Sequence, residues 1–100
     1  MSGVRDGLRP DDPVLTVFQW LLRRECHLTP RAAQVVAALY AGQTTSSAVG
    51  KHLGMCPQTV RNQYVAIHLR LSTQDRIGVI RATWPLFRQA EKILAGELAA

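Results

Sequence analysis

The chain has 100 residues, of which 47% are hydrophobic and 19% are charged, and these proportions are typical of a folded domain rather than a disordered segment. Its formal net charge is +5, and residues 26–74 contain no carboxylate side chain, which favours a polyanionic partner such as DNA. The sequence lacks an apolar run that could cross a membrane, the apolar core of a signal peptide and the cysteine spacing of a disulfide framework, so we expect a single-domain cytoplasmic protein without membrane contact.

The first elements expected along the chain are a flexible arm over residues 1–12 and a helix that follows it. The arm contains glycine and proline and few apolar side chains. In DDPVLTVFQWLLRRE, Asp12 is suited to cap a helix, Pro13 to occupy its first turn, and Arg23 and Arg24 to lie near its C-terminal end. The apolar face of this helix is broad, so it either covers a core on two sides or meets a second copy of the chain.

Three further helices are expected in the middle of the chain. The segment LTPRAAQVVAALYAG predicts a helix that Thr29 caps and Gly42 ends. The segment TTSSAVGKHLG predicts a short helix capped by Thr44 or Thr45. The segment CPQTVRNQYVAIHLRL then predicts a longer helix over roughly residues 56–71, because its apolar residues recur at helical spacing.

The last elements expected are two helices separated by a proline. The segment STQDRIGVIRATW predicts a helix that opens at Ser72 or Thr73. Pro85 disfavours helical geometry at Trp84, so it is expected to end or kink that helix. A sixth helix is expected over residues 85–100. Because no strand pattern occurs, we predict an all-α fold: a helix-turn-helix domain of four helices with one helix added at each end, all within residues 13–100.

The segment GKHLGMCPQTVRN meets the demands of two helices joined by a tight turn. Gly50 supplies a small residue where the pair packs closely, and Gly54 supplies a residue that tolerates positive φ in the turn. Cys56 stands at the cap position of the second helix and Pro57 at its first helical position. Apolar residues at suitable spacings would fix the pair to a core, and these are Val49, Leu53, Met55 and Val60.

The outward face of the second helix carries side chains suited to reading DNA. Arginine can bond guanine through two hydrogen bonds, asparagine and glutamine can bond adenine in the same way, and a valine methyl can contact thymine. The predicted base-contacting residues are Gln58, Arg61, Asn62 and Val65. The predicted phosphate-contacting residues are Thr45, Lys51, Thr59, Gln63 and Arg70. The alternative is an ordinary αα-hairpin whose polar residues are merely solvated.

Residues 28–81 resemble the LuxR/GerE-type helix-turn-helix domain of bacterial transcription regulators. The matching parts are LTPR, LYAG, VGKHLGM, TVRN and IHLRL. The resemblance implies a four-helix domain whose third helix enters the major groove and whose fourth helix, here near residues 73–84, mediates dimerisation. It also implies that Arg61 is the basic residue that contacts DNA, that Asn62 is its base-facing neighbour, and that Gln63 stands near the phosphates.

These observations predict a dimeric helix-turn-helix protein that binds double-stranded DNA sequence-specifically and regulates transcription in a bacterium or a bacterial mobile element. RNA polymerase is a further partner that such a regulator could contact. The predicted dimer interface consists of Ile77, Ile80, Trp84, Phe87 and Leu94. The alternative is a protein-interaction module, an anti-activator or a partner similar to sigma-factor region 4, that keeps this fold without reading DNA.

An enzyme is not expected, because the sequence has no phosphate-cradling glycine loop and no nucleophile elbow. No cofactor and no metal are expected either, since the cysteines and histidines lack the spacing of a ligand set. One alternative stays open for Cys56, which replaces the serine or threonine cap customary in the family. A thiol at a helix N-terminus can act as a redox sensor, although it can also be only a small substitute for the cap.

Overall fold

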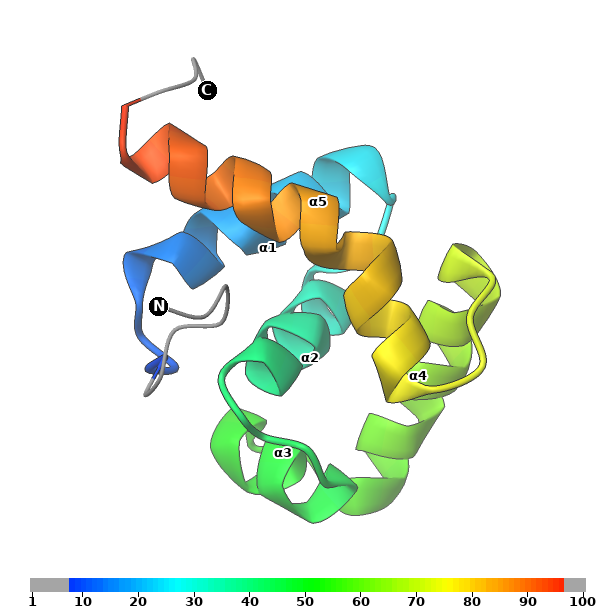
Figure 1. The fold of residues 1–100 in the computed structure, drawn as a ribbon. Coiled ribbons are helices and arrows are strands. Elements are labelled where there is room, and N and C mark those ends of the chain that lie inside the picture. Colours follow the sequence, from blue (N-terminus) through cyan, green and yellow to red (C-terminus); the bar gives the residue numbers. More distant parts are fainter. Residues whose placement is uncertain (1–7, 97–100) are drawn as a thin grey trace.

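The computed structural model describes residues 8–96, and this part of the chain is all-helical, which confirms the predicted fold class. It contains five helices, which are α1 (Pro13–Glu25), α2 (Pro30–Tyr40), α3 (Ser46–Leu53), α4 (Pro57–Leu71) and α5 (Arg76–Leu94) (Figure 1). Within residues 8–96, no helix is both long and apolar enough to cross a membrane. Residues 1–7 of the arm expected over residues 1–12, and residues 97–100 of the expected C-terminal helix, lie outside the described residues.

The first three helices begin at the predicted caps. The Asp12 carboxylate accepts a hydrogen bond from the Val14 amide at 3.0 Å, and the Thr29 hydroxyl accepts one from the Ala32 amide at 3.2 Å. At the start of α3 the cap is Thr45, whose hydroxyl accepts from the Ala48 amide at 3.0 Å. Each cap satisfies an amide that has no partner inside its own helix, which is why local sequence was enough to predict these boundaries.

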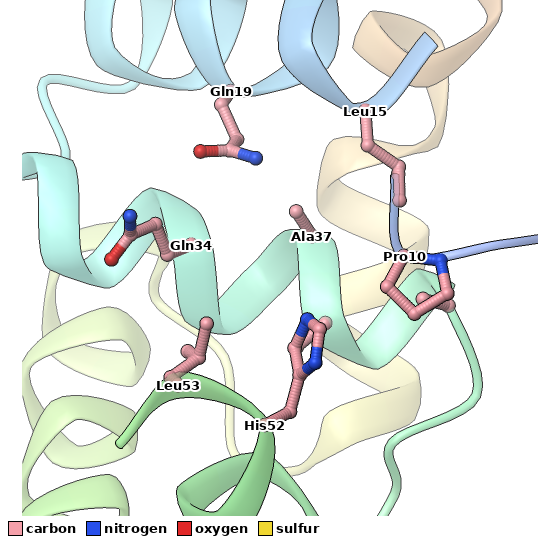
Figure 2. A pocket seen from close by; sticks show the side chains of 9 residues that line it. Pro10, Leu15, Gln19, Gln34, Ala37, His52 and Leu53 are labelled. Carbon is pink, nitrogen blue, oxygen red and sulfur yellow. The ribbon is translucent and has the colours of Figure 1, made fainter. Parts of the chain in front are cut away.

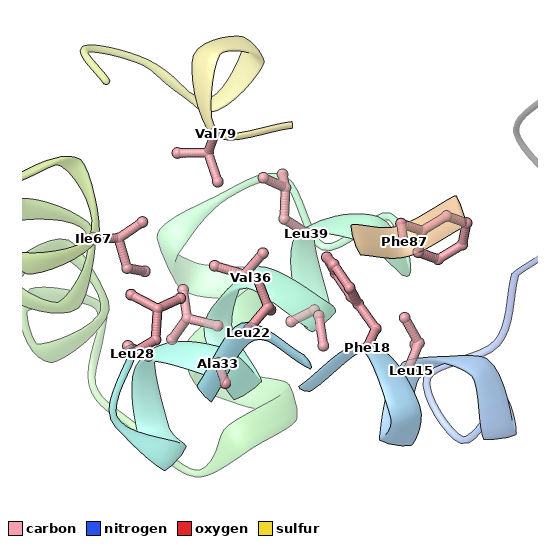
Figure 3. Close-up of a cluster of buried hydrophobic side chains, with 14 of the residues drawn as sticks. Leu15, Phe18, Leu22, Leu28, Ala33, Val36, Leu39, Ile67, Val79 and Phe87 are labelled. Carbon is pink, nitrogen blue, oxygen red and sulfur yellow. The ribbon is translucent and has the colours of Figure 1, made fainter. Parts of the chain in front are cut away.

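One buried cluster receives side chains from all five helices. In Figure 3, Val36 of α2 lies in the middle, with Ile67 of α4 on one side and Phe18 of α1 on the other. The Phe18 ring meets Tyr40 and Phe87 edge-on, at centroid distances of 4.6 and 5.4 Å. The broad apolar face of α1 therefore covers a core on two sides, since it packs on both α2 and α5.

The predicted end of a helix at Pro85, with a separate sixth helix after it, is wrong, because α5 runs as one helix from Arg76 to Leu94 with Pro85 inside it. The buried residues of α5 explain its continuity. Val79, Thr83, Phe87 and Ala90 follow one helical stripe across the proline and pack against the rest of the core. Pro85 itself is exposed, so the carbonyl group that loses its partner there can bond water. Tertiary packing therefore outweighs the local preference of the residue before proline.

The predicted start of α5 is also wrong. Ser72 has a φ of 57° and ends α4, and the Thr73 hydroxyl lies 2.9 Å from Nδ1 of His68 in the last turn of α4. Both residues therefore finish α4 rather than open α5. The cap of α5 is Asp75, whose carboxylate accepts from the Gly78 amide at 2.7 Å.

The predicted dimer interface is wrong at Phe87, whose side chain is only 2% exposed inside the core of its own chain. Ile80 and Trp84 are half-buried against the same core, whereas Ile77 and Leu94 are exposed. At the other end of the chain, Leu8 packs against the core. The part of the predicted arm that the structure describes, residues 8–12, is therefore fixed to the core through Leu8 just before α1 begins.

Candidate nucleic-acid interface

A tight turn of three residues joins α3 to α4. Gly54 adopts the left-handed conformation with a φ of 71°, as predicted, and the Met55 amide donates to the Gly50 carbonyl at 2.9 Å. A Cβ atom on Gly50 would collide with the Met55 carbonyl oxygen. Gly50 therefore has to be small, as predicted, but the group that approaches it belongs to the turn itself rather than to α4.

The α3–α4 pair is fixed to the core by apolar side chains from both helices. Val49 and Val60 are fully buried, and Leu53 and Met55 pack against the core from partly exposed positions. These are the four anchoring residues that the sequence predicted. Because both helices are anchored, the outward face of α4 has a defined orientation relative to the rest of the chain.

The predicted base-contacting residues lie together on the exposed face of α4. Gln58, Arg61 and Asn62 are exposed and hydrogen-bonded to one another. Nε2 of Gln58 donates to Oδ1 of Asn62 at 3.0 Å, and Nη2 of Arg61 donates to Oε1 of Gln58 at 3.2 Å. We call these three residues the polar triplet. It holds amide and guanidinium groups in one array of donors and acceptors on the first two turns of α4.

The same face becomes apolar further along α4. Val65 is 59% exposed, and Leu69, which the sequence analysis did not single out, is 80% exposed. The two residues are one helical turn apart, so they continue the line of the polar triplet toward the C-terminal end of α4. Helical spacing predicted Val65 on this face but not Leu69, because exposed and buried apolar residues look alike in a sequence.

The predicted phosphate-contacting residues are not all in one place. Thr45 and Lys51 are exposed at opposite ends of α3, and Thr59 is exposed in the first turn of α4. Gln63 is half-buried on the side of α4. Arg70 is exposed but lies about 13 Å further along the helix axis than Arg61, at 1.5 Å per residue, and so belongs to the other end of α4.

Cys56 occupies the cap position of α4 without forming a regular side-chain cap. Its sulfur lies 3.1 Å from the hydroxyl oxygen of Thr59, and this contact, together with the nearby backbone amides of Thr59 and Gln58, lowers the pKa of the exposed thiol. Burial raises the pKa of the other free thiol, that of Cys26, and the neighbouring carboxylate of Glu25 adds to this increase. Among residues 8–96, no three histidine, cysteine or acidic side chains come together as a metal site.

The sequence analysis missed a group of polar residues where α3, α4 and α5 meet. The Arg76 guanidinium carbon lies 4.4 Å above the centre of the Tyr64 ring, and Nη2 of Arg76 donates to the Ser46 hydroxyl at 3.5 Å. Burial raises the pKa of Tyr64, and the positive charge of Arg76 partly opposes this increase. No local pattern could have predicted this arrangement, because its three residues come from three different helices.

A separate hollow lies between α1, α2 and α3. Figure 2 shows Gln19 of α1 and His52 of α3 pointing toward α2 across this space. Its volume is about 90 Å³. That volume is well below the roughly 300–1,000 Å³ of a small-molecule site, so the hollow is not suited to a cofactor.

Comparisons of this chain with models of protein families, with curated proteins and with solved structures find no match. A functional assignment therefore has to come from the residues and geometry described above.

Proposed function

We propose that this protein binds double-stranded DNA sequence-specifically and regulates transcription as a homodimer in the bacterial cytoplasm. The observation that carries the proposal is the polar triplet on the N-terminal half of α4. Arginine, asparagine and glutamine are the residues that form paired hydrogen bonds with base edges, and a helix of this width fits the major groove. The next residue on that face, Val65, offers methyl groups to thymine.

The polar triplet is organised before any ligand is present. Its internal hydrogen bonds restrict the side chain of Arg61, which otherwise has many rotamers. Binding would exchange these exposed hydrogen bonds for bonds to bases, at a smaller entropic cost than ordering a free arginine would require. Preorganisation of this kind favours discrimination between base pairs, because the donors are already held in a fixed pattern.

The distribution of charge also supports a polyanionic partner. Residues 26–74, which include all of α2, α3 and α4, contain no carboxylate side chain. Lys51, Arg61 and Arg70 are exposed on α3 and α4. A phosphate backbone lying along α3 and the first turns of α4 would meet Lys51 and Arg61 without an opposing acidic group, and each neutralised phosphate would release counterions.

The homodimer that we propose would form along the first half of α5. Ile77 is 63% exposed there, and the half-buried Ile80 and Trp84 lie on the next turns. A two-fold arrangement of α5 helices would place two copies of α4 so that they read two half-sites. Phe87 is excluded from this interface because its own core covers it.

The experiment that tests the proposal is selection of bound duplexes from a random DNA pool, followed by binding to the selected sequence at several salt concentrations. We expect a palindromic sequence and an affinity that falls steeply with salt. Arg61→Ala should cost about 1–3 kcal/mol on the selected site, whereas Lys51→Ala should weaken selected and unrelated sequences equally. The matched control is Arg23→Ala, which removes one exposed positive charge from the far end of α1.

One observation favours the protein-interaction module as a second function. An open apolar hollow of about 320 Å³ lies between α1 and α5, lined by Thr16, Val17, Trp20 and Ile93. Exposed apolar patches of this kind commonly bind proteins. If random-pool selection enriches no sequence even at low salt, the DNA-binding proposal is refuted and this alternative takes its place. If a sequence is selected but Arg61→Ala leaves binding to it intact, the placement of α4 in the groove is wrong.

A further inference from the structure

Arg76, the first residue of α5, holds a positive charge that neither the core nor the polar triplet uses. Its guanidinium group lies on the face of the Tyr64 ring, and one of its nitrogens reaches the Ser46 hydroxyl at the start of α3. In Figure 1 the start of α5 lies beside α4. One half-buried cation therefore contacts both helices of the α3–α4 pair.

This cation has no negative partner within residues 8–96. None of the ion pairs among these residues includes Arg76. The acidic residue next to it, Asp75, directs its carboxylate to the Gly78 amide as the cap of α5. A half-buried arginine without a counter-charge is unfavourable, because its charge is partly removed from water and only the Tyr64 ring and the Ser46 hydroxyl replace the lost solvation.

Two polar atoms in the same place lack a well-formed hydrogen bond. These are Nε of Arg76 and the hydroxyl of Tyr64, both buried, and Tyr64 as a whole is only 5% exposed. The Arg76 side chain lies close enough to the Tyr64 hydroxyl to oppose the rise in its pKa, so the two groups face each other. Leaving a buried donor unpaired costs about 1–3 kcal/mol, so native proteins generally satisfy such groups with another residue, a water or a ligand. The unpaired Nε of this uncompensated cation indicates that an acceptor oxygen belongs beside Arg76.

The start of α3 adds further donors at the same point. Thr45 caps the Ala48 amide. The amides of Ser46 and Ser47 lie in the first turn of α3, so the carbonyl groups four residues before them are outside the helix and do not accept from them. The N-terminal end of a helix carries a partial positive charge, and its free amides are suited to an oxyanion. Because Ser46 is also the residue that Arg76 contacts, the free helix end and the guanidinium group lie together.

We propose that Arg76, the Ser46 hydroxyl and the first amides of α3 form a phosphate-binding site, and that its ligand in the complex is a backbone phosphate of DNA. This identification of the ligand rests on the proposed function. Tyr64, which supports the guanidinium group, is three residues from Arg61 and thus about one helical turn away. A phosphate held here would flank the base pairs read by the polar triplet. The site thereby makes α5, as well as α4, part of the DNA-binding surface.

The experiment measures two properties of the full chain, with inorganic phosphate and DNA as separate probes. In the first arm, nuclear magnetic resonance follows the backbone amides of Ser46 and Ser47 and the Nε–H group of Arg76 while inorganic phosphate is added. We expect saturable shifts in the unmodified protein and in the control Arg81→Gln, and none in Arg76→Gln. Arg81 is an exposed arginine of α5, so its replacement removes the same charge without touching the site.

In the second arm, binding of the selected DNA is measured against salt concentration. Arg76→Gln should weaken binding about tenfold and lower the slope of log affinity against log salt by about 0.9, the value for one phosphate contact. A second variant, Ser46→Ala, leaves charge unchanged and should weaken phosphate binding in the first arm, which guards against loss of folding in Arg76→Gln.

The two arms separate failure of this site from failure of the proposed function. If the unmodified protein shows no saturable shift, and a folded Arg76→Gln variant binds DNA with the same affinity and salt slope as Arg81→Gln, the phosphate site is refuted while DNA binding stands. If saturable shifts occur but no DNA sequence is selected, the anion site stands and the proposed function is refuted, together with the assignment of its ligand to DNA.

Discussion

Replacing Pro85 by alanine should make the protein more stable, because Pro85 lies inside a continuous helix. Proline has no amide hydrogen, so the Arg81 carbonyl four residues earlier lacks its usual partner within α5. Proline in a helix interior costs about 3 kcal/mol relative to alanine. Removing it also raises the conformational entropy of the unfolded chain, which lowers the free energy of unfolding by about 0.4–1 kcal/mol. The expected net gain in the free energy of unfolding is therefore about 2 kcal/mol.

Urea denaturation followed by far-ultraviolet circular dichroism measures this gain, and thermal denaturation checks it, since 1 kcal/mol corresponds to about 4–8 °C in a domain of this size. Pro30→Ala is the matched control. Pro30 is the first residue of α2, where no helical partner awaits an amide, so this change should destabilise the protein by about 0.4–1 kcal/mol. A Pro85→Ala variant that is no more stable than the unmodified protein would refute the reasoning and indicate that the helix breaks before Pro85.

Three other measurements test local features of the structure. Gly50→Ala should destabilise the protein by about 1–3 kcal/mol in urea denaturation, because its Cβ meets the Met55 carbonyl. Gly54→Ala should also destabilise it, because alanine is strained at a φ of 71° although its Cβ meets no atom, and a Gly50→Ala variant as stable as the unmodified protein would contradict the close approach at Gly50. Iodoacetamide should modify Cys56 faster than Cys26 at neutral pH, because the lowered pKa of Cys56 gives more thiolate and the raised pKa of Cys26 gives less. Peptide mass spectrometry measures the two rates, and equal rates would contradict this prediction. Spectrophotometric titration should show Tyr40 ionising only near pH 12, because burial raises the pKa of Tyr40 to about 12. Ionisation of all tyrosines near pH 10, the usual value, would contradict the burial of Tyr40.

The parts of the fold that were predictable from sequence are those decided by neighbouring residues. Asp12 and Thr29 cap helices because each sits two or three residues before the amide it bonds. Gly54 could be assigned to a turn because few other residues adopt its positive φ without strain. The exposed positions of the polar triplet followed in the same way, since helical spacing relative to the buried Val60 determines which side chains point outward.

The parts that were not predictable depend on contacts between helices. Pro85 disfavours a helix locally, but Phe87 and the residues around it are buried on the same stripe as those before the proline, and only the assembled core reveals this. Phe87 was assigned to a dimer interface for the same reason, because an apolar residue on a helix face does not indicate which surface covers it. The contact of Arg76 with Tyr64 and Ser46 joins three helices, so no periodic pattern in the sequence indicates it.

The position of Arg76 links the two surfaces that the proposed function requires. Arg76 begins α5, and the next residue, Ile77, is the most exposed apolar residue of the proposed dimer interface. If the start of α5 holds a phosphate on one side and a second subunit on the other, then each interaction restricts the same helix end. A dimer would present two such helix ends to one duplex, so DNA binding and dimerisation would favour each other by linkage. Under the proposed function, the polar triplet would supply discrimination between sequences, whereas the start of α5 would hold both a phosphate and the second subunit.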